Sequence, residues 1–258
     1  MNTSNLFSLK GRVALITGGS RGIGKMIAAG FLAQGAKVYI TARKAVACDA
    51  AAAELSALGT CISLPWDVSS VEHANALAQE FAKLEPSLDI LVNNAGAAWG
   101  AEFDQFPEAG WDKVVDLNMK MPFFLTQALI APLRAAAKNG SPAKVINIAS
   151  IDGVSVNPME TYSYAASKAG LIHLTKRMAL RLVKDNIVVS AIAPGAFASD
   201  MNREARDHAD EVSKQIPAGR IGVDTDMAGT AIFLASKAGD YVVGETIVVD
   251  GGITHARG

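Results

Sequence analysis

Short apolar runs alternate with longer alanine-rich stretches along the whole chain, and this alternation restricts the possible folds more than any other feature. The apolar runs are Val13–Thr17, Val38–Thr41, Cys61–Leu64, Ile90–Asn93, Lys144–Ile148, Val188–Ile192 and Thr246–Val249. The helical stretches between them include Gly24–Gln34, Ala45–Leu58, Val71–Leu84, Trp111–Lys138, Tyr164–Lys184 and Asp226–Ser236. Short strands buried on both faces are typical of parallel sheets with right-handed helical crossovers. The sequence therefore predicts an α/β fold, a doubly wound parallel sheet of Rossmann type with helices on both faces.

Length and composition fit a single domain and argue against several classes of partner. The chain has 258 residues and no linker rich in proline or serine, so we expect one domain over residues 1–258. A formal net charge of −1 indicates neither a nucleic-acid nor a membrane-surface partner. The first residues lack the pattern of a signal peptide, and no apolar run approaches the roughly 20 residues that cross a bilayer. We expect a cytoplasmic protein.

The cysteines and the charged segments do not predict a metal site. Cys48 and Cys61 form no CxxC pair, which favours ordinary reduced thiols. The charged stretch Arg206–Glu211 contains one histidine, but a solvated surface helix explains it better than metal binding does. The wider segment Ala196–Gln215 follows a Pro-Gly pair and is rich in charged residues. It is either a mobile polar lid over a substrate or an ordinary surface helix.

A glycine-rich turn, Thr17-Gly18-Gly19-Ser20-Arg21-Gly22-Ile23-Gly24, follows the first apolar run. Glycines permit a tight turn and the close approach of a ligand, and the N–H groups of the following helix suit a pyrophosphate. The spacing Gly-x-x-x-Gly-x-Gly differs from the usual Gly-x-Gly-x-x-Gly, and it lacks the Gly-Lys-Ser/Thr of a Walker loop. Its position after the first strand favours dinucleotide binding over a plain turn and disfavours ATP.

The end of the second predicted strand bears on the choice of dinucleotide. Folds specific for NAD carry an acidic residue about 20 residues after the glycine turn, where it binds the ribose 2′-hydroxyl. Here Ala42 stands at that position, Arg43 follows it, and Arg21 lies in the turn itself. Two guanidinium groups without a neighbouring carboxylate suit a 2′-phosphate. The sequence therefore predicts NADP(H) rather than NAD(H), unless Arg43 is only a solvated residue at a helix start.

Tyr164 and Lys168 are four residues apart in a stretch predicted to be helical, so their side chains share one face. A nearby ammonium favours the phenolate and lowers the pKa of a tyrosine, which suits it to general acid/base catalysis. By itself such a pair is weak evidence, because an ordinary helix surface contains it far more often than a catalytic site does. Its meaning depends on the motifs that accompany it.

Together these motifs resemble the short-chain dehydrogenase/reductase family, over about Lys10 to Gly252. The resemblance rests on an ordered set: Thr17–Gly24, Asp67-Val68, Asn93-Asn94-Ala95-Gly96, Asn118, Ser150, Tyr164 with Lys168, and Pro194-Gly195. Within the family the chain is most similar to the NADPH-dependent 3-oxoacyl (beta-ketoacyl) reductase branch. The resemblance implies a reversible reduction of a ketone to a secondary alcohol by hydride transfer, with no metal.

The family resemblance also implies a role for each matching residue. Tyr164 would donate the proton and Ser150 would orient the carbonyl. Lys168 would lower the pKa of the tyrosine and hold the nicotinamide ribose, and Asn118 would bend its helix and relay protons through water. The residues expected to bind NADP(H) are Gly18, Ser20, Arg21, Gly22, Ile23, Gly24, Arg43, Asp67, Val68, Asn94, Ala95, Gly96, Tyr164, Lys168, Pro194, Gly195, Phe197 and Ser199.

The substrate and the assembly stay open at this stage. A 3-oxoacyl thioester or another apolar ketone is favoured by a set of apolar residues expected near the substrate, although simple loop packing also explains them: Ala97, Ala98, Trp99, Ile151, Val154, Met159, Phe197 and Met201. Asp185 stands where a carrier-protein-dependent relative would carry a docking cation. The alternatives are a sugar or polyol dehydrogenase and a non-catalytic cofactor sensor. By resemblance, the two longest helices would form a dimer face, and Val248–Gly252 would support a homotetramer, a dimer of dimers.

Overall fold

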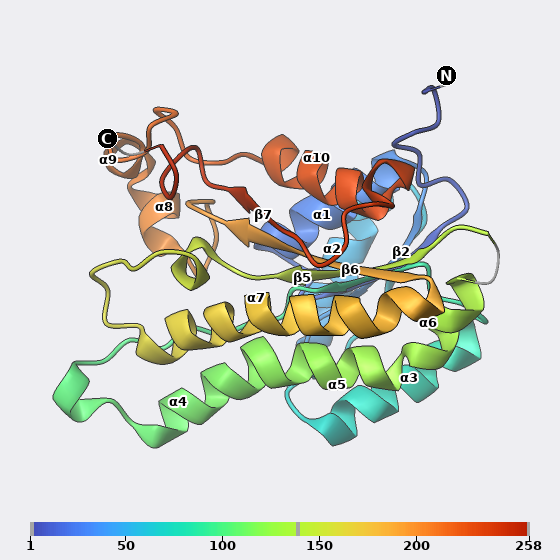
Figure 1. Ribbon diagram of the computed structural model, residues 1–258, viewed down its shortest axis with the longest axis horizontal. Coiled ribbons are helices and arrows are strands. Elements are labelled where there is room, and N and C mark those ends of the chain that lie inside the picture. Colours follow the sequence, from blue (N-terminus) through green and yellow to red (C-terminus); the bar gives the residue numbers. More distant parts are fainter. Residues whose placement is uncertain (1–2, 138–139, 257–258) are drawn as a thin grey trace.

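The computed structural model describes residues 3–137 and 140–256, and in these residues seven strands form one sheet (Figure 1). The strands are β1 Val13–Thr17, β2 Lys37–Thr41, β3 Cys61–Ser63, β4 Ile90–Asn93, β5 Ala143–Ile148, β6 Ile187–Pro194 and β7 Thr246–Val249. Their order in the sheet is β3-β2-β1-β4-β5-β6-β7, and every neighbouring pair is parallel. The predicted α/β fold is confirmed. The strand order changes direction between β1 and β4, which places a switch point there.

Helices cover both faces of the sheet (Figure 1). On one face lie α1 Gly22–Ala33, α2 Ala45–Leu55 and α10 Asp224–Ala235, and on the other lie α3 Val71–Leu84, α4 Glu108–Val115, α5 Met121–Ala128, α6 Ile130–Ala137 and α7 Tyr162–Leu182. Two further short helices, α8 Arg203–Asp207 and α9 Ala209–Ser213, follow β6. Among the residues placed by the structure, no helix combines the length and apolarity needed to span a membrane.

Burial explains why the strands read as continuous apolar runs. Every residue of β5 and β6 is buried, because helices pack on both sides of the sheet. The core divides into two clusters, one under α1 and α10 around Phe31, the other under α3 and α5 around Phe81. Each cluster is built from one alternating set of strand side chains, as the period of two in a strand requires.

One buried polar network lies within this apolar interior. The Asn93 side chain at the end of β4 donates a hydrogen bond of 2.9 Å to Asn147 of β5, and the two residues face each other in the strand register. Asn93 also donates to Thr126 of α5 at 3.2 Å, and Asn147 donates to Thr175 of α7 at 2.9 Å. The network therefore ties two helices to two central strands.

The sequence prediction of one helix over Trp111–Lys138 is wrong. In the structure a π-helical turn, Asp116–Lys120, separates α4 from α5, and a further break separates α5 from α6; Lys138 lies outside the described residues. Two prolines explain the breaks. Pro122 has no N–H to bond the carbonyl of Asn118, and Pro132 has none for the carbonyl of Ala128.

Smaller corrections concern the ends of elements. β5 begins at Ala143, one residue before the predicted run, and ends at Ile148 as predicted; Ser150 lies two residues beyond it and caps a 3₁₀ turn, Ile151–Gly153. The helix predicted over Tyr164–Lys184 begins two residues earlier, at Tyr162, and ends at Leu182. The chain leaves it through a 3₁₀ turn that Asn186 closes in the left-handed conformation, with φ of 58°.

Candidate active site

The predicted site residues gather at the carboxyl ends of the central strands. The glycine turn follows β1, the segment Asn94–Gly96 follows β4, Ser150 follows β5 and Gly195 follows β6. Ligands of open parallel sheets bind at this edge, beside the point where the strand order reverses. In Figure 1 the segments α8 and α9 lie at the same end of the molecule. The fold therefore brings together residues that are far apart in the sequence.

Backbone geometry explains why the turn after β1 is rich in glycine. Gly18 and Gly22 have φ of 65° and 51°, in the left-handed region that side chains disfavour. A Cβ on Gly24 would lie 2.4 Å from the carbonyl oxygen of Gly18, which is closer than atoms can approach. The side chain of Arg21, the N-cap residue of α1, makes no capping hydrogen bond, which suits the N–H groups of the first turn to binding an anion. This turn fits a pyrophosphate.

Thr17 and Asn94 fix the position of this turn. The Thr17 hydroxyl accepts hydrogen bonds of 2.9 Å from the backbone N–H groups of Asn94 and Ala95. The Asn94 amide in turn donates to the carbonyls of Thr17 and Gly18, at 2.8 Å and 3.2 Å. The side chain of Asn94 therefore holds the turn itself, and any contact that it makes with a cofactor stays a prediction.

The end of β2 presents positive charge without a neighbouring carboxylate at the expected acidic position. Ala42 is half-buried, and Arg43 after it is exposed. Arg21 projects from the glycine turn with 72 % of its side chain exposed, and it forms an ion pair with Asp200. The two guanidinium groups and the glycine turn together fit a dinucleotide that carries an additional phosphate.

The remaining predicted cofactor residues divide into buried supports and partly exposed positions. Val68 is buried in the core beneath β4, whereas Asp67 is half-buried and accepts a hydrogen bond from the Ser69 N–H at 3.0 Å. Phe197 is also buried, with its ring against Gly222, so its side chain anchors the segment after β6. Its predicted contact with the cofactor can therefore involve only its backbone. Ser199 lies beside Gly22 of the glycine turn.

Ser150, Tyr164 and Lys168 come together as the resemblance implied. The Ser150 hydroxyl accepts a hydrogen bond of 3.1 Å from the Asp152 N–H, and its side chain also bonds Tyr164. Lys168 is buried, and its ammonium donates to the Ile148 carbonyl at 2.7 Å. The same ammonium lies 5.6 Å from the centre of the Tyr164 ring. The three side chains come from the end of β5 and the first turns of α7.

The electrostatics of this cluster differ from the sequence prediction. Burial raises the pKa of Tyr164 to about 12, although a hydrogen bond with the Ser150 side chain opposes the shift. The ring itself is only half-buried, so the desolvation acts mainly around its hydroxyl. Burial also lowers the pKa of Lys168 to about 8. The predicted lowering of the tyrosine pKa by Lys168 is therefore not seen in this arrangement of side chains.

Asn118 occupies the π turn between α4 and α5, where the helix is bent, and its predicted part in the bend stays a prediction. Its side chain accepts from the Ala97 N–H at 2.8 Å and donates to the Ala97 carbonyl at 2.9 Å. It also donates to the Ser167 hydroxyl at 3.1 Å, and Ser167 donates to the carbonyl of Tyr164 at 2.8 Å. Sequence reasoning missed Ser167. Its position within the Tyr164–Lys168 turn was the available signal.

Asp152 is a second residue that sequence reasoning missed. It lies two residues beyond Ser150 in the 3₁₀ turn, and Gly153 of this turn lies against the Lys168 backbone, where a Cβ would be 2.6 Å from the carbonyl carbon. Burial raises the pKa of the Asp152 carboxyl, while Asn157 and Lys168 oppose the shift. The negative charge of Asp152 raises the pKa of both Tyr164 and Lys168. The signal available in the sequence was the position of Asp152, two residues after Ser150.

Comparisons with known proteins show what this chain is similar to. The sequence profile of the family described as Enoyl-(Acyl carrier protein) reductase matches residues 18–254. The rhamnolipid-biosynthesis 3-oxoacyl-[acyl-carrier-protein] reductase of Pseudomonas aeruginosa is 47 % identical over 249 residues, which cover 95 % of this chain and 97 % of the relative. The 2-dehydro-3-deoxy-D-gluconate 5-dehydrogenase of Dickeya dadantii is 38 % identical over 252 residues, covering 96 % and 97 %. Both relatives span nearly the full length of the chain.

Among solved structures, the RhlG/NADP active-site complex of Pseudomonas aeruginosa is similar to this chain. The two share a TM-score of 0.94 and 46 % sequence identity, over 98 % of this chain and 100 % of the other. A likeness of this extent includes every element that carries the candidate site.

We expect Gly24→Ala to weaken dinucleotide binding about tenfold or more, the equivalent of about 1.4 kcal/mol, because the new methyl group would displace the turn at Gly18. Gly229→Ala is the matched control, since nothing lies within 4 Å of a Cβ there. Gly229 is inside α10, so alanine should stabilise the fold by about 0.5–1 kcal/mol. Calorimetric titration and thermal unfolding of both variants measure the two effects. Equal dinucleotide affinity in the two variants would contradict the assignment.

Asp152→Asn should lower the pKa of Tyr164, because it removes a negative charge that disfavours the phenolate. The phenolate would then form at lower pH, and the pKa of Lys168 would fall as well. Phenolate absorbance is measured as a function of pH in each protein and in the same protein carrying Tyr164→Phe. The difference between the two curves is the titration of Tyr164. Asp104→Asn is the control, because the charge of Asp104 acts on Tyr162 instead. An unmoved Tyr164 titration in Asp152→Asn would refute the electrostatic role of Asp152.

Proposed function

This chain belongs to the short-chain dehydrogenase/reductase family, and on that premise we propose that it reduces an apolar ketone, with 3-oxoacyl thioesters as the leading candidates. It is an oxidoreductase that interconverts a ketone and a secondary alcohol and uses NADP(H). The observation that carries the proposal is the meeting of Ser150, Tyr164 and Lys168 beside the glycine turn at one edge of the sheet. NADPH supplies the hydride when it is bound.

Each residue of this cluster has a distinct task in the proposed reaction. The Ser150 hydroxyl would donate its proton to the substrate carbonyl oxygen, while its own oxygen accepts from the Asp152 N–H. Tyr164 donates its proton to the oxygen that becomes the alcohol, which stabilises the developing alkoxide. The raised pKa of Tyr164 keeps the phenol protonated at neutral pH, as reduction requires. Lys168 would hold the nicotinamide ribose and stabilise the phenolate left after proton transfer.

The π turn supports the proposed proton route through Asn118. The side chain of Asn118 is committed to Ala97 and Ser167, so it has little capacity to bind a relay water. Its main-chain carbonyl is different, because Pro122 has no N–H to donate to it. This carbonyl can accept from a water that passes protons towards Tyr164. Pro122 thus provides both the bend and an available acceptor.

Exposed apolar side chains around the cluster support an apolar substrate. Trp99, Val154, Met159 and Met201 are 37 %, 41 %, 64 % and 51 % exposed, and they come from the three segments that follow β4, β5 and β6. A sugar would instead call for hydrogen-bonding groups at these positions. The segment Ala196–Gln215 folds into α8 and α9 at the same edge, and we assign it as the substrate lid.

The surroundings of Asp185 bear on whether an acidic carrier protein presents the substrate. Asp185 accepts hydrogen bonds from Arg134 at 2.7 Å and from Arg181 at 3.3 Å. These two guanidinium groups are therefore engaged within the chain, and docking an acidic partner there would compete with an existing carboxylate. This arrangement favours a free ketone or thioester over one that is attached to a carrier protein.

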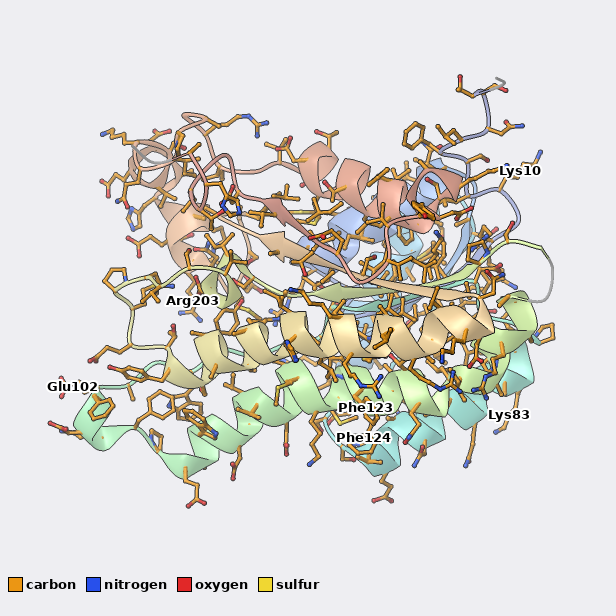
Figure 2. The ribbon with its side chains drawn as sticks, viewed as in Figure 1. Lys10, Lys83, Glu102, Phe123, Phe124 and Arg203 are labelled. Carbon is orange, nitrogen blue, oxygen red and sulfur yellow. The ribbon has the colours of Figure 1, made fainter. Side chains whose placement is uncertain are left out.

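We also propose a homotetramer. Trp111 of α4, Phe123 of α5 and Leu180 of α7 are 42 %, 37 % and 65 % exposed, and they belong to the helices that cover one face of the sheet; Figure 2 labels Phe123. Large exposed apolar side chains on one helical layer favour an interaction surface. A second copy of the chain fits this face, and the edge strand β7 offers unpaired backbone groups for a second interface.

The test of the activity is NADPH oxidation followed by absorbance, against a panel of ketones, keto-esters, 3-oxoacyl thioesters and sugars. We expect turnover with the acyl thioesters and apolar ketones, and Tyr164→Phe should lower kcat by about a hundredfold or more while NADPH affinity is kept. Tyr162→Phe is the matched control, because Tyr162 is bonded to Glu160 and lies away from Lys168 in the helical turn. Preferred turnover of sugars would replace the substrate proposal, and near-normal turnover by Tyr164→Phe would refute the mechanism.

Leu180→Glu should reduce the mass measured by size-exclusion chromatography with light scattering, because two glutamates would be buried across the proposed dimer face. Val46→Glu is the control, since Val46 is 84 % exposed on α2, on the opposite side of the sheet. The unchanged protein should elute with the mass of four chains. A monomeric mass for it, or an equal effect of both substitutions, would exclude this assembly.

A further inference from the structure

The carboxylate of Asp200 joins the glycine turn to the proposed lid. Its Oδ2 accepts from the Nη1 of Arg21, which projects from the turn, and its Oδ1 accepts from the Nη1 of Arg206 in α8 at 2.7 Å. Arg21 is the stronger influence of the two on the pKa of Asp200, which both arginines lower, so this carboxyl is ionised at neutral pH. The segment that contains the carboxylate lies in the same part of Figure 2 as the labelled Arg203.

The backbone around Asp200 is held against the glycine turn. Phe197 anchors the start of the segment, because its ring is buried against Gly222. Ser199 lies beside Gly22, where a glycine Cβ would be 3.3 Å from the Cβ of the serine. The Ser199 hydroxyl also accepts from the Asn202 N–H at 3.1 Å. Ser199, which precedes Asp200, is therefore held beside the glycine turn and bonded to the backbone of Asn202, and this arrangement presents the carboxylate to Arg21.

We propose that Asp200 is a specificity-determining residue, which competes with the 2′-phosphate of NADP(H) for the guanidinium of Arg21. This inference rests on the proposed function of Arg21 as a ligand of that phosphate. A ribose phosphate carries a charge between −1 and −2 and offers oxygens that an arginine binds in the same fork geometry as a carboxylate. NADP(H) must therefore displace Asp200 from Arg21, and the carboxylate keeps Arg206 as its remaining partner. NAD(H) has no group that requires this exchange.

The competition makes Asp200 act on one cofactor only. In binding NADP(H), the chain loses the Arg21–Asp200 pair and brings two anions near each other. When NAD(H) binds, the Arg21–Asp200 ion pair persists, so the pair contributes equally to the free energy of the free and the bound protein. Arg21 and Asp200 are both well exposed, with 72 % and 48 % of their side chains accessible, so the pair is weak and easily exchanged. Asp200 therefore lowers the preference for NADP(H) by a modest factor and does not abolish it.

The experiment compares Asp200→Asn with Asp207→Asn. Both substitutions remove one negative charge from the same segment and both leave Arg206 with one carboxylate partner, because Asp207 bonds Arg206 but is not bonded to Arg21. Dissociation constants for NADPH, NADH and 2′,5′-ADP are measured by calorimetric titration without substrate. We expect Asp200→Asn to bind NADPH and 2′,5′-ADP on the order of twofold to fivefold more tightly, the range of an exposed ion pair. NADH binding should not change, and Asp207→Asn should resemble the unsubstituted protein.

Arg21→Ala separates failure of this inference from failure of the proposed function. If Arg21→Ala weakens 2′,5′-ADP binding and Asp200→Asn tightens it only while Arg21 is present, the competition is established. If Arg21→Ala weakens binding but Asp200→Asn has no effect, the inference is wrong and the role of Arg21 stands. If Arg21→Ala leaves 2′,5′-ADP binding unchanged, both are wrong. An equal gain for NADH, or for Asp207→Asn, would show a general charge effect and overturn the competition.

Discussion

The hydrogen bond between the side chains of Asn93 and Asn147 is the interaction on which the placement of the site depends. It joins β4 to β5 inside the apolar layer, and its partners Thr126 and Thr175 belong to α5 and α7. The Asn93 Nδ2 and both groups of the Asn147 amide used here are bonded within the network, whereas the Asn93 Oδ1 is buried without a partner among the described residues. Losing a further hydrogen bond would leave another buried polar atom unpaired, which disfavours alternative arrangements. The helix that carries Tyr164 and the helix that follows Asn118 are therefore located relative to the strand ends by polar contacts. Apolar packing alone would specify their register less sharply.

The sheet could be predicted from the sequence because its strands are buried on both faces. Continuous apolar runs such as those of β1 and β4 are rarely compatible with a surface helix or a loop, and their boundaries agree with the structure. The broken helix was missed because an alanine-rich, apolar stretch looks uniform, although Pro122 and Pro132 lie within it. A proline removes one specific donor, and the consequence falls four residues earlier, on Asn118 and Ala128. The breaks could have been predicted by asking which backbone carbonyl each proline leaves without its helical hydrogen bond.

The members of the candidate site were largely predictable, but their energetics were not. An i, i+4 spacing places Tyr164 and Lys168 on one face, and the end of a strand places Ser150 near them. Spacing does not reveal that both titrating groups are desolvated, which raises the pKa of Tyr164 to about 12 and lowers that of Lys168 to about 8. Nor does it reveal Asp152, whose charge opposes the effect of burial on Lys168. These shifts arise from atoms that are distant in the sequence.

Two arginines at the cofactor edge make different contributions because their surroundings differ. Arg43 follows Ala42 at an exposed strand end, where no acidic residue occupies the position that would repel a phosphate. Arg21 is engaged by Asp200, so part of its binding energy offsets the loss of an existing pair. A reductase must release its oxidised cofactor in each cycle, and a phosphate held by two unopposed guanidinium groups would leave slowly. If Asp200 competes for Arg21 as proposed, its carboxylate would speed that release without removing the charge that attracts the cofactor, because it would occupy Arg21 as the phosphate departs.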